Sequence, residues 1–246
     1  MTNYGENALV SGLSFLAEKQ ASIANNLANV DTTSFKRRAA MAQSSGDRFH
    51  TMLDNKMSTV GYTERSDMQR GTLRETGNKL NVAIDGPEWM RVQNSTGGEF
   101  YTRNGQLNIA LDGYLTTRDG LRVLSKDGTP IQLGGGENTP TDLTFSPNGT
   151  ISDQATGQEF GPLALVALPN PEALVPVGRG LYSDPKQQQG TQGVSGLQQG
   201  FLEGSNVDSL QELVAMITVE RSFSATQKAL SGMDRLQGNL ISNILR

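Results

Sequence analysis

The 246-residue chain contains no cysteine and only one histidine, His50. The missing cysteines exclude a disulfide framework, a thiolate nucleophile, an iron–sulfur cluster and every cysteine-type zinc site. A single histidine excludes the usual histidine-rich zinc sites, and any serine–histidine–aspartate arrangement would depend on His50 alone. The other residues form no persuasive catalytic, cofactor-binding or metal-binding pattern, so we expect no enzyme, no cofactor and no metal site.

Long apolar runs and an excess of positive charge are also missing. Hydrophobic residues make up 35% of the chain, and no stretch approaches the 18–20 successive apolar residues of a membrane span. The formal net charge of −4 argues against nucleic acid as the main partner. The N-terminus lacks the basic start and apolar run of a secretory signal peptide, so we expect no membrane insertion and no cleaved signal.

The first 30 residues have the pattern of a long helix with one narrow apolar seam. Alanines on the flanks of the seam favour a helix and allow a neighbour to approach closely. The Asp31–Ser34 segment favours a turn, so the helix is expected to end there. The seam positions recur at steps of three and four, as in a coiled coil; they are Leu9, Leu13, Leu16, Ile23, Leu27 and Val30.

A second seam lies at the other end of the chain. Residues 210–246 contain no proline, and Ser209 with Glu212 has the spacing of a capping box. The seam positions are Met216, Val219, Phe223, Thr226, Leu230, Met233, Gln237, Leu240 and Ile244. Because neither helix can bury its seam alone, the sequence predicts one discontinuous terminal coiled-coil domain formed by residues 1–38 and 203–246.

The middle of the chain has a different pattern. Residues 73–200 alternate with period two and are interrupted by turn-forming pairs, at Asn104-Gly105, Asp112-Gly113, Asp119-Gly120, Asp127-Gly128 and Asn148-Gly149. Such pairs favour hairpin turns, so we expect an inserted, mainly antiparallel β domain and an α+β fold class. We interpret residues 39–72 as a linker region, whose conformation (a strand pair, a helix or neither) the sequence does not determine. We interpret the Gln/Gly-rich residues 187–199 as a flexible connection.

A short basic cluster, Lys36-Arg37-Arg38, follows the first predicted helix. We expect it to stay solvated and to complement the helix dipole. A contact with anionic lipid or with a partner protein is the alternative.

Two segments next to the predicted helices resemble signatures of the bacterial flagellar rod and hook proteins. They are IANNLANVDTTSFK at residues 23–36 and GFLEGSNV at residues 200–207. Residues 80–86, 101–105 and 112–120 are similar to strand motifs of the same family and occur in the same order. Ser34 stands where the family usually has glycine, which puts the conformation of that turn in question.

The resemblance implies a structural protein. In this family the terminal helices form an inner layer that lines an axial tube, and the β domain lies outside it. The implied partners are other rod proteins, further copies of the chain and the flagellar type III export machinery, and the implied location is the periplasmic rod of the basal body. The compact length and Glu220-Arg-Ser-Phe223 favour a proximal-rod subunit over a distal-rod or hook-type subunit.

For contacts between subunits we predict apolar residues of both seams. We expect three asparagines, Asn25, Asn26 and Asn29, to fix the end of the first helix and to donate hydrogen bonds between subunits. The apolar residues are Leu13, Leu16, Ile23, Leu27, Leu213, Ile217, Phe223, Leu230 and Leu240. Three alternatives remain: helices that simply close a monomer, an exported β-domain binding module with helical arms, and an unrelated cytoplasmic coiled-coil oligomer.

Overall fold

The computed structural model describes residues 4–43, 61–135, 140, 142–193 and 196–244, and the chain forms two compact units. Unit 1 comprises Met1–Val30, Arg37–Asp67 and Val207–Arg246, and unit 2 comprises Asp31–Lys36 and Met68–Asn206. The only histidine, His50, lies outside the described residues.

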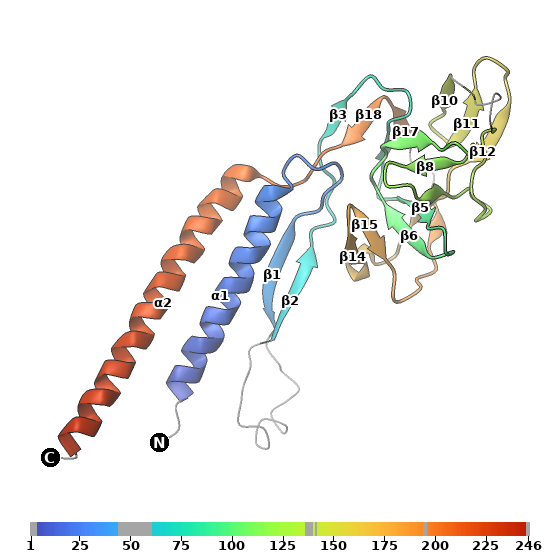
Figure 1. Ribbon diagram of the computed structural model, residues 1–246. Helices are drawn as coiled ribbons and strands as arrows, with labels where there is room; N and C mark the ends of the chain where they lie inside the picture. Colours follow the sequence, from blue (N-terminus) through green and yellow to red (C-terminus); the bar gives the residue numbers. More distant parts are fainter. Residues whose placement is uncertain (1–3, 44–60, 136–139, 141, 194–195, 245–246) are drawn as a thin grey trace. The chain divides into compact units, whose positions relative to one another are not determined.

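Unit 1 contains two long helices and a two-stranded ribbon. Helix α1 spans Tyr4–Ala28, and helix α2 spans Ser209–Ile244, packs against α1 and runs in the opposite direction (Figure 1). Strands β1 (Arg38–Gln43) and β2 (Gly61–Ser66) pair antiparallel, and β1 also packs on α1. The two predicted helices are therefore confirmed, and the segment whose conformation the sequence left open contains a strand pair.

The N-terminus of α2 differs from the prediction by one residue. Asp208, not Ser209, caps the helix, because its Oδ1 accepts hydrogen bonds from the backbone N–H groups of Leu210 (2.9 Å) and Gln211 (3.2 Å). The carboxylate of Glu212 binds Arg37 instead of turning back to the cap. The predicted capping box is therefore wrong, although the helix begins where it was expected.

Unit 2 is built from short strands, and every pairing in it between the strands described is antiparallel. Nine strands form the largest sheet, with the order β14-β15-β6-β5-β9-β8-β7 and with β13 pairing both β5 and β16. A three-stranded sheet, β10-β11-β12, and two ribbons, β17-β4 and β18-β3, complete the unit. The strands are β3 (Leu73–Glu75), β4 (Val82–Asp85), β5 (Trp89–Gln93), β6 (Glu99–Thr102), β7 (Leu107–Ile109), β8 (Leu115–Thr117), β9 (Arg122–Val123), β10 (Leu143–Phe145), β11 (Thr150–Asp153), β12 (Glu159–Pro162), β13 (Leu165–Ala167), β14 (Val175–Gly178), β15 (Leu181–Ser183), β16 (Thr191–Gln192), β17 (Gly196–Gln199) and β18 (Phe201–Glu203), with a 3-10 turn, η2, at Pro171–Ala173. The α+β class is confirmed.

Four of the five predicted turns share one geometry. In each, the glycine donates its N–H to the carbonyl three residues earlier and has a positive φ, as at Gly113 (φ 79°) and Gly149 (φ 88°). The preceding Asp or Asn keeps an ordinary φ, so these are type I turns that end on a left-handed glycine rather than two-residue turns.

Two sequence predictions fail in unit 2. Asn104-Gly105 does not join a hairpin, since β6 pairs with β5 and β15 while β7 pairs with β8. A Cβ on Gly105 would lie 1.6 Å from the carbonyl oxygen of Val82, so glycine is needed there for close backbone approach. The Gln/Gly-rich segment is not a flexible connection at its end, because β17 pairs with β4 and Gln199 donates hydrogen bonds to two backbone carbonyls.

The core of unit 2 has a main cluster of aliphatic residues and a smaller aromatic one. The main cluster joins β4, β5, β7 and β8 to β10, β11 and β17. In the smaller cluster the only tryptophan, Trp89, packs edge to face on Tyr182 with 5.0 Å between ring centroids. Trp89 is therefore a buried reporter of the folding of unit 2.

Candidate assembly site

Helix α1 presents three different faces. The positions of the predicted seam on α1, among them Leu13, Leu16 and Leu27, are half-buried, and Ile23 is buried. A second face carries Ser22, which donates a hydrogen bond to the Arg38 carbonyl in β1. A third face is exposed and consists mainly of small residues; it carries Val10, Ser14, Ala17, Ala21, Ala24 and Ala28. The ribbon β1-β2 and α2 thus leave one side of α1 uncovered.

The three asparagines of the N-terminal motif behave differently from one another. Asn26 is fully buried, accepts a hydrogen bond from the Arg38 N–H and donates one to the Arg38 carbonyl, both at 2.8 Å. Asn29 donates to the backbone carbonyl of Asn25, whose own side chain is exposed. Asn26 and the buried Ile23 are therefore occupied within the chain, and we leave both out of any surface between subunits.

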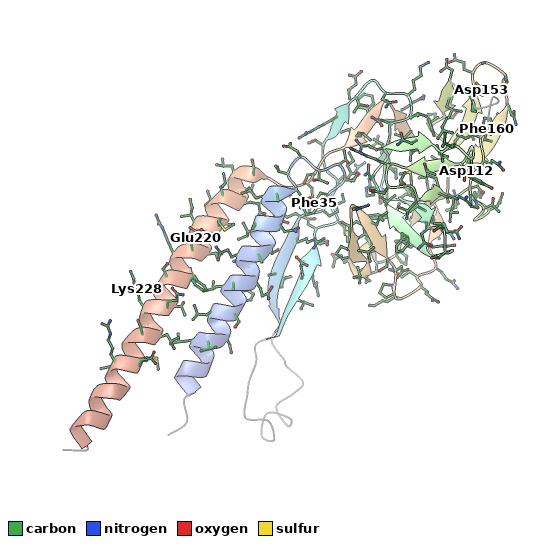
Figure 2. All side chains as sticks on the ribbon, viewed as in Figure 1. Phe35, Asp112, Asp153, Phe160, Glu220 and Lys228 are labelled. Carbon is green, nitrogen blue, oxygen red and sulfur yellow. The ribbon has the colours of Figure 1, made fainter. Side chains whose placement is uncertain are left out.

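Helix α2 has two contrasting faces. Half-buried and buried residues recur along it at steps of three and four, and the most buried apolar one is Val219. Phe223 and Leu230 belong to this face, which is directed toward α1, and side chains fill the space between the two helices (Figure 2). By contrast, Leu213 and Ile217 are exposed. The side chain of Leu240 lies outside the part of the chain that is described.

A buried charged cluster in unit 2 joins residues from the two terminal motifs. Glu203 of β18 accepts hydrogen bonds from Lys36 Nζ (2.6 Å), Arg103 Nε (2.7 Å) and the Gly71 N–H (3.1 Å). The side chains of Lys36, Arg103 and Glu203 are 0%, 2% and 1% exposed. Arg103 also donates to the backbone carbonyls of Glu88 and Ile84. We call these three side chains the Glu203 cluster.

The charges of Lys36 and Arg103 determine the protonation state of the Glu203 carboxyl group. Burial alone would raise the pKa of Glu203, but the positive charges of Arg103 and Lys36 and their hydrogen bonds lower this pKa below its usual value. Glu203 is therefore ionised at neutral pH, and its carboxylate bridges two buried cations. The expectation that Lys36 is solvated is wrong, and sequence reasoning also missed the structural role of Arg103.

Ser34 resolves the question that the sequence raised about the first turn. It adopts a left-handed conformation with φ 55°, which glycine adopts without steric cost. Its buried hydroxyl donates a 2.8 Å hydrogen bond to the Arg103 carbonyl. The turn therefore keeps a backbone conformation suited to glycine, and the serine adds a tie to the Glu203 cluster.

A second ion pair lies within unit 1. Arg37 Nε donates to Glu212 of α2, whose side chain is 1% exposed, while Arg37 itself is half-buried. The pair links the residue that precedes β1 to the first turns of α2. Of the basic cluster Lys36-Arg37-Arg38, two side chains thus bind carboxylates of the C-terminal region, far away in the sequence.

The cavities and charged groups of the described residues offer no catalytic arrangement. A cavity of about 520 Å³ in unit 2 is lined by Met68, Trp89, Arg70, Asp85 and Arg103 among others. Its charged residues are engaged, since Arg70 pairs with Asp85 at 2.8 Å and Arg103 with Glu203. Within the described ranges no group of acidic or histidine side chains could hold a metal ion, and neither helix is long and apolar enough to cross a membrane.

Comparison with known proteins agrees with this arrangement. Three family models match in chain order: flagella basal body rod protein at residues 7–36, the flagellar hook protein FlgE/F/G D1 domain at residues 83–153, and the flagellar basal body rod FlgEFG protein C-terminal region at residues 198–243. The flagellar basal-body rod protein FlgG of Buchnera aphidicola subsp. Acyrthosiphon pisum is 30% identical over 240 residues, which cover 87% of this chain and 89% of that protein. The chain belongs to the flagellar basal-body rod protein family.

Other members of the family match over nearly the whole chain. FlgG of Agrobacterium fabrum is 29% identical over 90% of this chain and 92% of its own length. FlgF of Caulobacter vibrioides is 28% identical over 97% of this chain and 98% of its own length. The resemblance expected from the sequence is confirmed: this is a structural rod protein of the FlgF/FlgG type, not an enzyme, and it belongs to the flagellar basal body in assembly with other rod proteins.

Proposed function

We propose that the chain assembles through its two terminal helices into the inner, coiled-coil layer of the rod tube, with the β-rich region outside. Residues 1–38 and 203–246 would form the inner layer, residues 73–200 the outer one, and residues 39–72 would connect them through β1 and β2. The observation that supports this most is the long antiparallel packing of α1 on α2, which leaves apolar side chains of both helices exposed. A globular monomer of this size would normally cover such faces.

The physical mechanism is repeated burial of helix surface. Each contact between neighbouring subunits removes apolar area from water, which is worth roughly 25 cal/mol per Å². Because the exposed faces of α1 and α2 differ, the contact is head-to-tail, and such a contact builds a helical tube when the rotation between neighbours does not close a ring. Such a tube would transmit motor torque and enclose the export channel, and the flagellar type III machinery would deliver each subunit unfolded to the periplasmic rod.

Within the rod we propose the proximal position, as for FlgF, with the distal FlgG position as the alternative. Glu220-Arg-Ser-Phe223 supports the proximal type. Relatives named FlgG and FlgF match at 30% and 28% identity, so that overall similarity favours neither position. Cryo-electron microscopy of basal bodies that carry a tagged subunit distinguishes them, because extra density at the distal end of the rod would contradict the proximal proposal.

The decisive experiment is quantitative mass spectrometry of purified hook–basal bodies from the source bacterium. If the chain is a rod subunit, its peptides are present at a fixed ratio to those of other rod proteins. Recovery of the chain only from the cytoplasm or the medium would favour the oligomer or the binding module instead.

A single substitution tests the role of the helix seam. Leu27 is half-buried and belongs to the predicted seam of α1, so Leu27→Asp introduces a charge into that seam. We expect loss of incorporation into the rod and of swimming motility, while unfolding followed by Trp89 fluorescence stays unchanged because Trp89 belongs to unit 2. Normal motility in this variant would rule out the seam as the assembly element.

A further inference from the structure

The first two turns of α2 carry large apolar side chains on the side away from α1. Leu210, Leu213, Val214 and Ile217 are 70%, 46%, 58% and 51% exposed. Their spacing of three, four and seven residues places them on one face, which we call the apolar stripe of α2. Figure 2 shows Lys228, farther along α2, also on the side that faces away from α1. The start of α2 is apolar on two opposite sides, because Met216 and Val219 lie on the side toward α1 and the apolar stripe lies on the side away from it. This pattern is expected for a helix that is covered on both sides.

The exposed face of α1 has the opposite character. From Ser14 onward it carries mainly serine and alanine at steps of three and four, with the exposed Asn25 at its border; the small residues are Ser14, Ala17, Ala21, Ala24 and Ala28. Small side chains let the backbone of another helix come close, and large side chains from that helix then fill the space between the two. This small-residue face of α1 is separate from the face that packs on α2 and borders the face that holds β1, since Ala21 lines a cavity with Ser22 and with Ala40 of β1.

We infer that the apolar stripe of α2 docks on the small-residue face of α1 in a neighbouring copy of the chain. The inference rests on the proposed function and names the two surfaces that meet. Every copy carries both surfaces, the described part of the chain covers neither of them, and their side chains are complementary in size. A second α2 on this face would also continue the helix packing that α1 already makes with its own α2, so that α1 lies between two α2 helices.

The small area of the stripe shows what kind of assembly it serves. Four side chains over two turns, about 10 Å of helix, fall well short of the roughly 1,000 Å² that a stable pairwise interface buries. The stripe therefore cannot hold a dimer by itself and is effective only where each subunit makes several contacts at once. Because the two surfaces differ, the contact is heterologous and can repeat from subunit to subunit along the proposed helical rod. The free subunit is accordingly monomeric.

The absence of cysteine from the chain makes cross-linking a direct test. Ile217→Cys is combined in turn with Ala17→Cys, Ala21→Cys or Ala24→Cys, because the assembly sets the register between the helices. We expect at least one pair to give disulfide-linked dimers and higher multimers in oxidised basal bodies and none in the free subunit. The matched control combines Ser222→Cys with the same partners, since Ser222 is exposed but lies on another face of α2. Rods that contain the variants without links, or equal linking by the Ser222 pairs, would overturn the inference.

A second readout covers variants that assemble poorly. Ile217→Lys places a charge in the proposed contact and should lower incorporation into the rod roughly tenfold or more, whereas Ser222→Lys should incorporate like the unaltered chain. Equal incorporation of the two lysine variants contradicts the inference. Failure of the inferred pairing is distinguishable from failure of the proposed function. If the unaltered chain is absent from basal bodies, the rod role itself is refuted. An unaltered chain that is present, with no effect of Ile217→Lys, refutes only the pairing of these two faces.

Discussion

Replacement of Glu203 by glutamine tests whether the Glu203 cluster holds unit 2 together. The change preserves shape but removes the negative charge between Lys36 and Arg103, which are both buried. A glutamine oxygen can still accept one set of hydrogen bonds. Its amide group, however, has only hydrogens to offer the second donor, so one N–H of the cluster loses its acceptor. Two cations then remain in a site that water does not reach.

The expected loss is large. Removing one partner of a buried, hydrogen-bonded ion pair costs about 3–5 kcal/mol, because the remaining charge is left uncompensated. Water screens these charges little, since the three side chains are at most 2% exposed. A domain has a total stability of about 5–15 kcal/mol, so the substitution removes a substantial part of it. For a unit of this size the midpoint of thermal unfolding should fall by roughly 6–20 °C.

Urea denaturation followed by Trp89 fluorescence measures this loss in the right unit. Trp89 is the only tryptophan and is 2% exposed, and its ring centroid lies 5.7 Å from the Arg103 guanidinium carbon. The control is Glu99→Gln, which breaks a surface pair with Arg91 and should cost about 1 kcal/mol or less. A loss from Glu203→Gln no larger than that of the control would refute the assigned role of the Glu203 cluster.

The same substitution predicts a pH dependence. The pKa of Glu203 is lower in the folded chain than its ordinary value of 4.5, so its contribution is complete above that value and is lost as the pH falls through the folded pKa. The difference in unfolding free energy between the unaltered chain and Glu203→Gln should be constant near neutral pH and shrink below about pH 4.5. A difference that grows on acidification would contradict the direction of the shift.

Two further predictions concern the N-terminal motif. Ser34→Ala should lower the free energy of unfolding by about 1–3 kcal/mol, because it removes the hydrogen bond to the Arg103 carbonyl and keeps the strain of the left-handed backbone. Ser34→Gly should lower it by about 1 kcal/mol less, since glycine relieves that strain. Urea titrations of both variants check the order, and a glycine variant less stable than the alanine variant would contradict it. Asn26→Ala should lower the free energy of hydrogen-exchange protection of β1 and of the end of α1 by about 2–3 kcal/mol, because it removes both hydrogen bonds to the Arg38 backbone. Asn25→Ala, at an exposed position, should leave this protection unchanged. Equal effects of the two variants would show that the hydrogen bonds to Arg38 contribute little.

The sequence predicted those elements whose signal is local. Both helices were found because their apolar period persists over more than five turns, and four β-turns because a left-handed glycine closes each of them. Asn104-Gly105 has the same letters but fails as a turn, because the demand for glycine comes from the Val82 carbonyl, a neighbour in space and not in sequence.

Charged contacts over long separations could not be predicted in this way. Lys36 and Glu203 are 167 residues apart, and Arg37 and Glu212 are 175 apart. Nothing near Lys36 distinguishes a buried lysine from a solvated one, and Glu212 at the start of a helix has the spacing of a capping residue. One signal was available. Lys36 lies in the N-terminal family motif and Glu203 in the C-terminal one, and a hypothesis that the two motifs contact each other would have paired these residues.

The fold of unit 2 should depend on residues 196–203, which form β17 and β18. A chain that ends at Val207 keeps β17, β18 and Glu203, whereas a chain that ends at Gln192 loses all three. We expect the longer chain to show the cooperative Trp89 unfolding transition of the full chain, since the residues of unit 2 are present. The shorter chain should show none, because β4 loses its partner strand and Lys36 and Arg103 lose the carboxylate that both of them bind. A normal transition in the shorter chain would mean that residues 196–203 are dispensable for the core. If instead the transition is lost, the core of unit 2 closes only once residues 196–203 are present, although they lie more than 90 residues after Trp89 in the sequence.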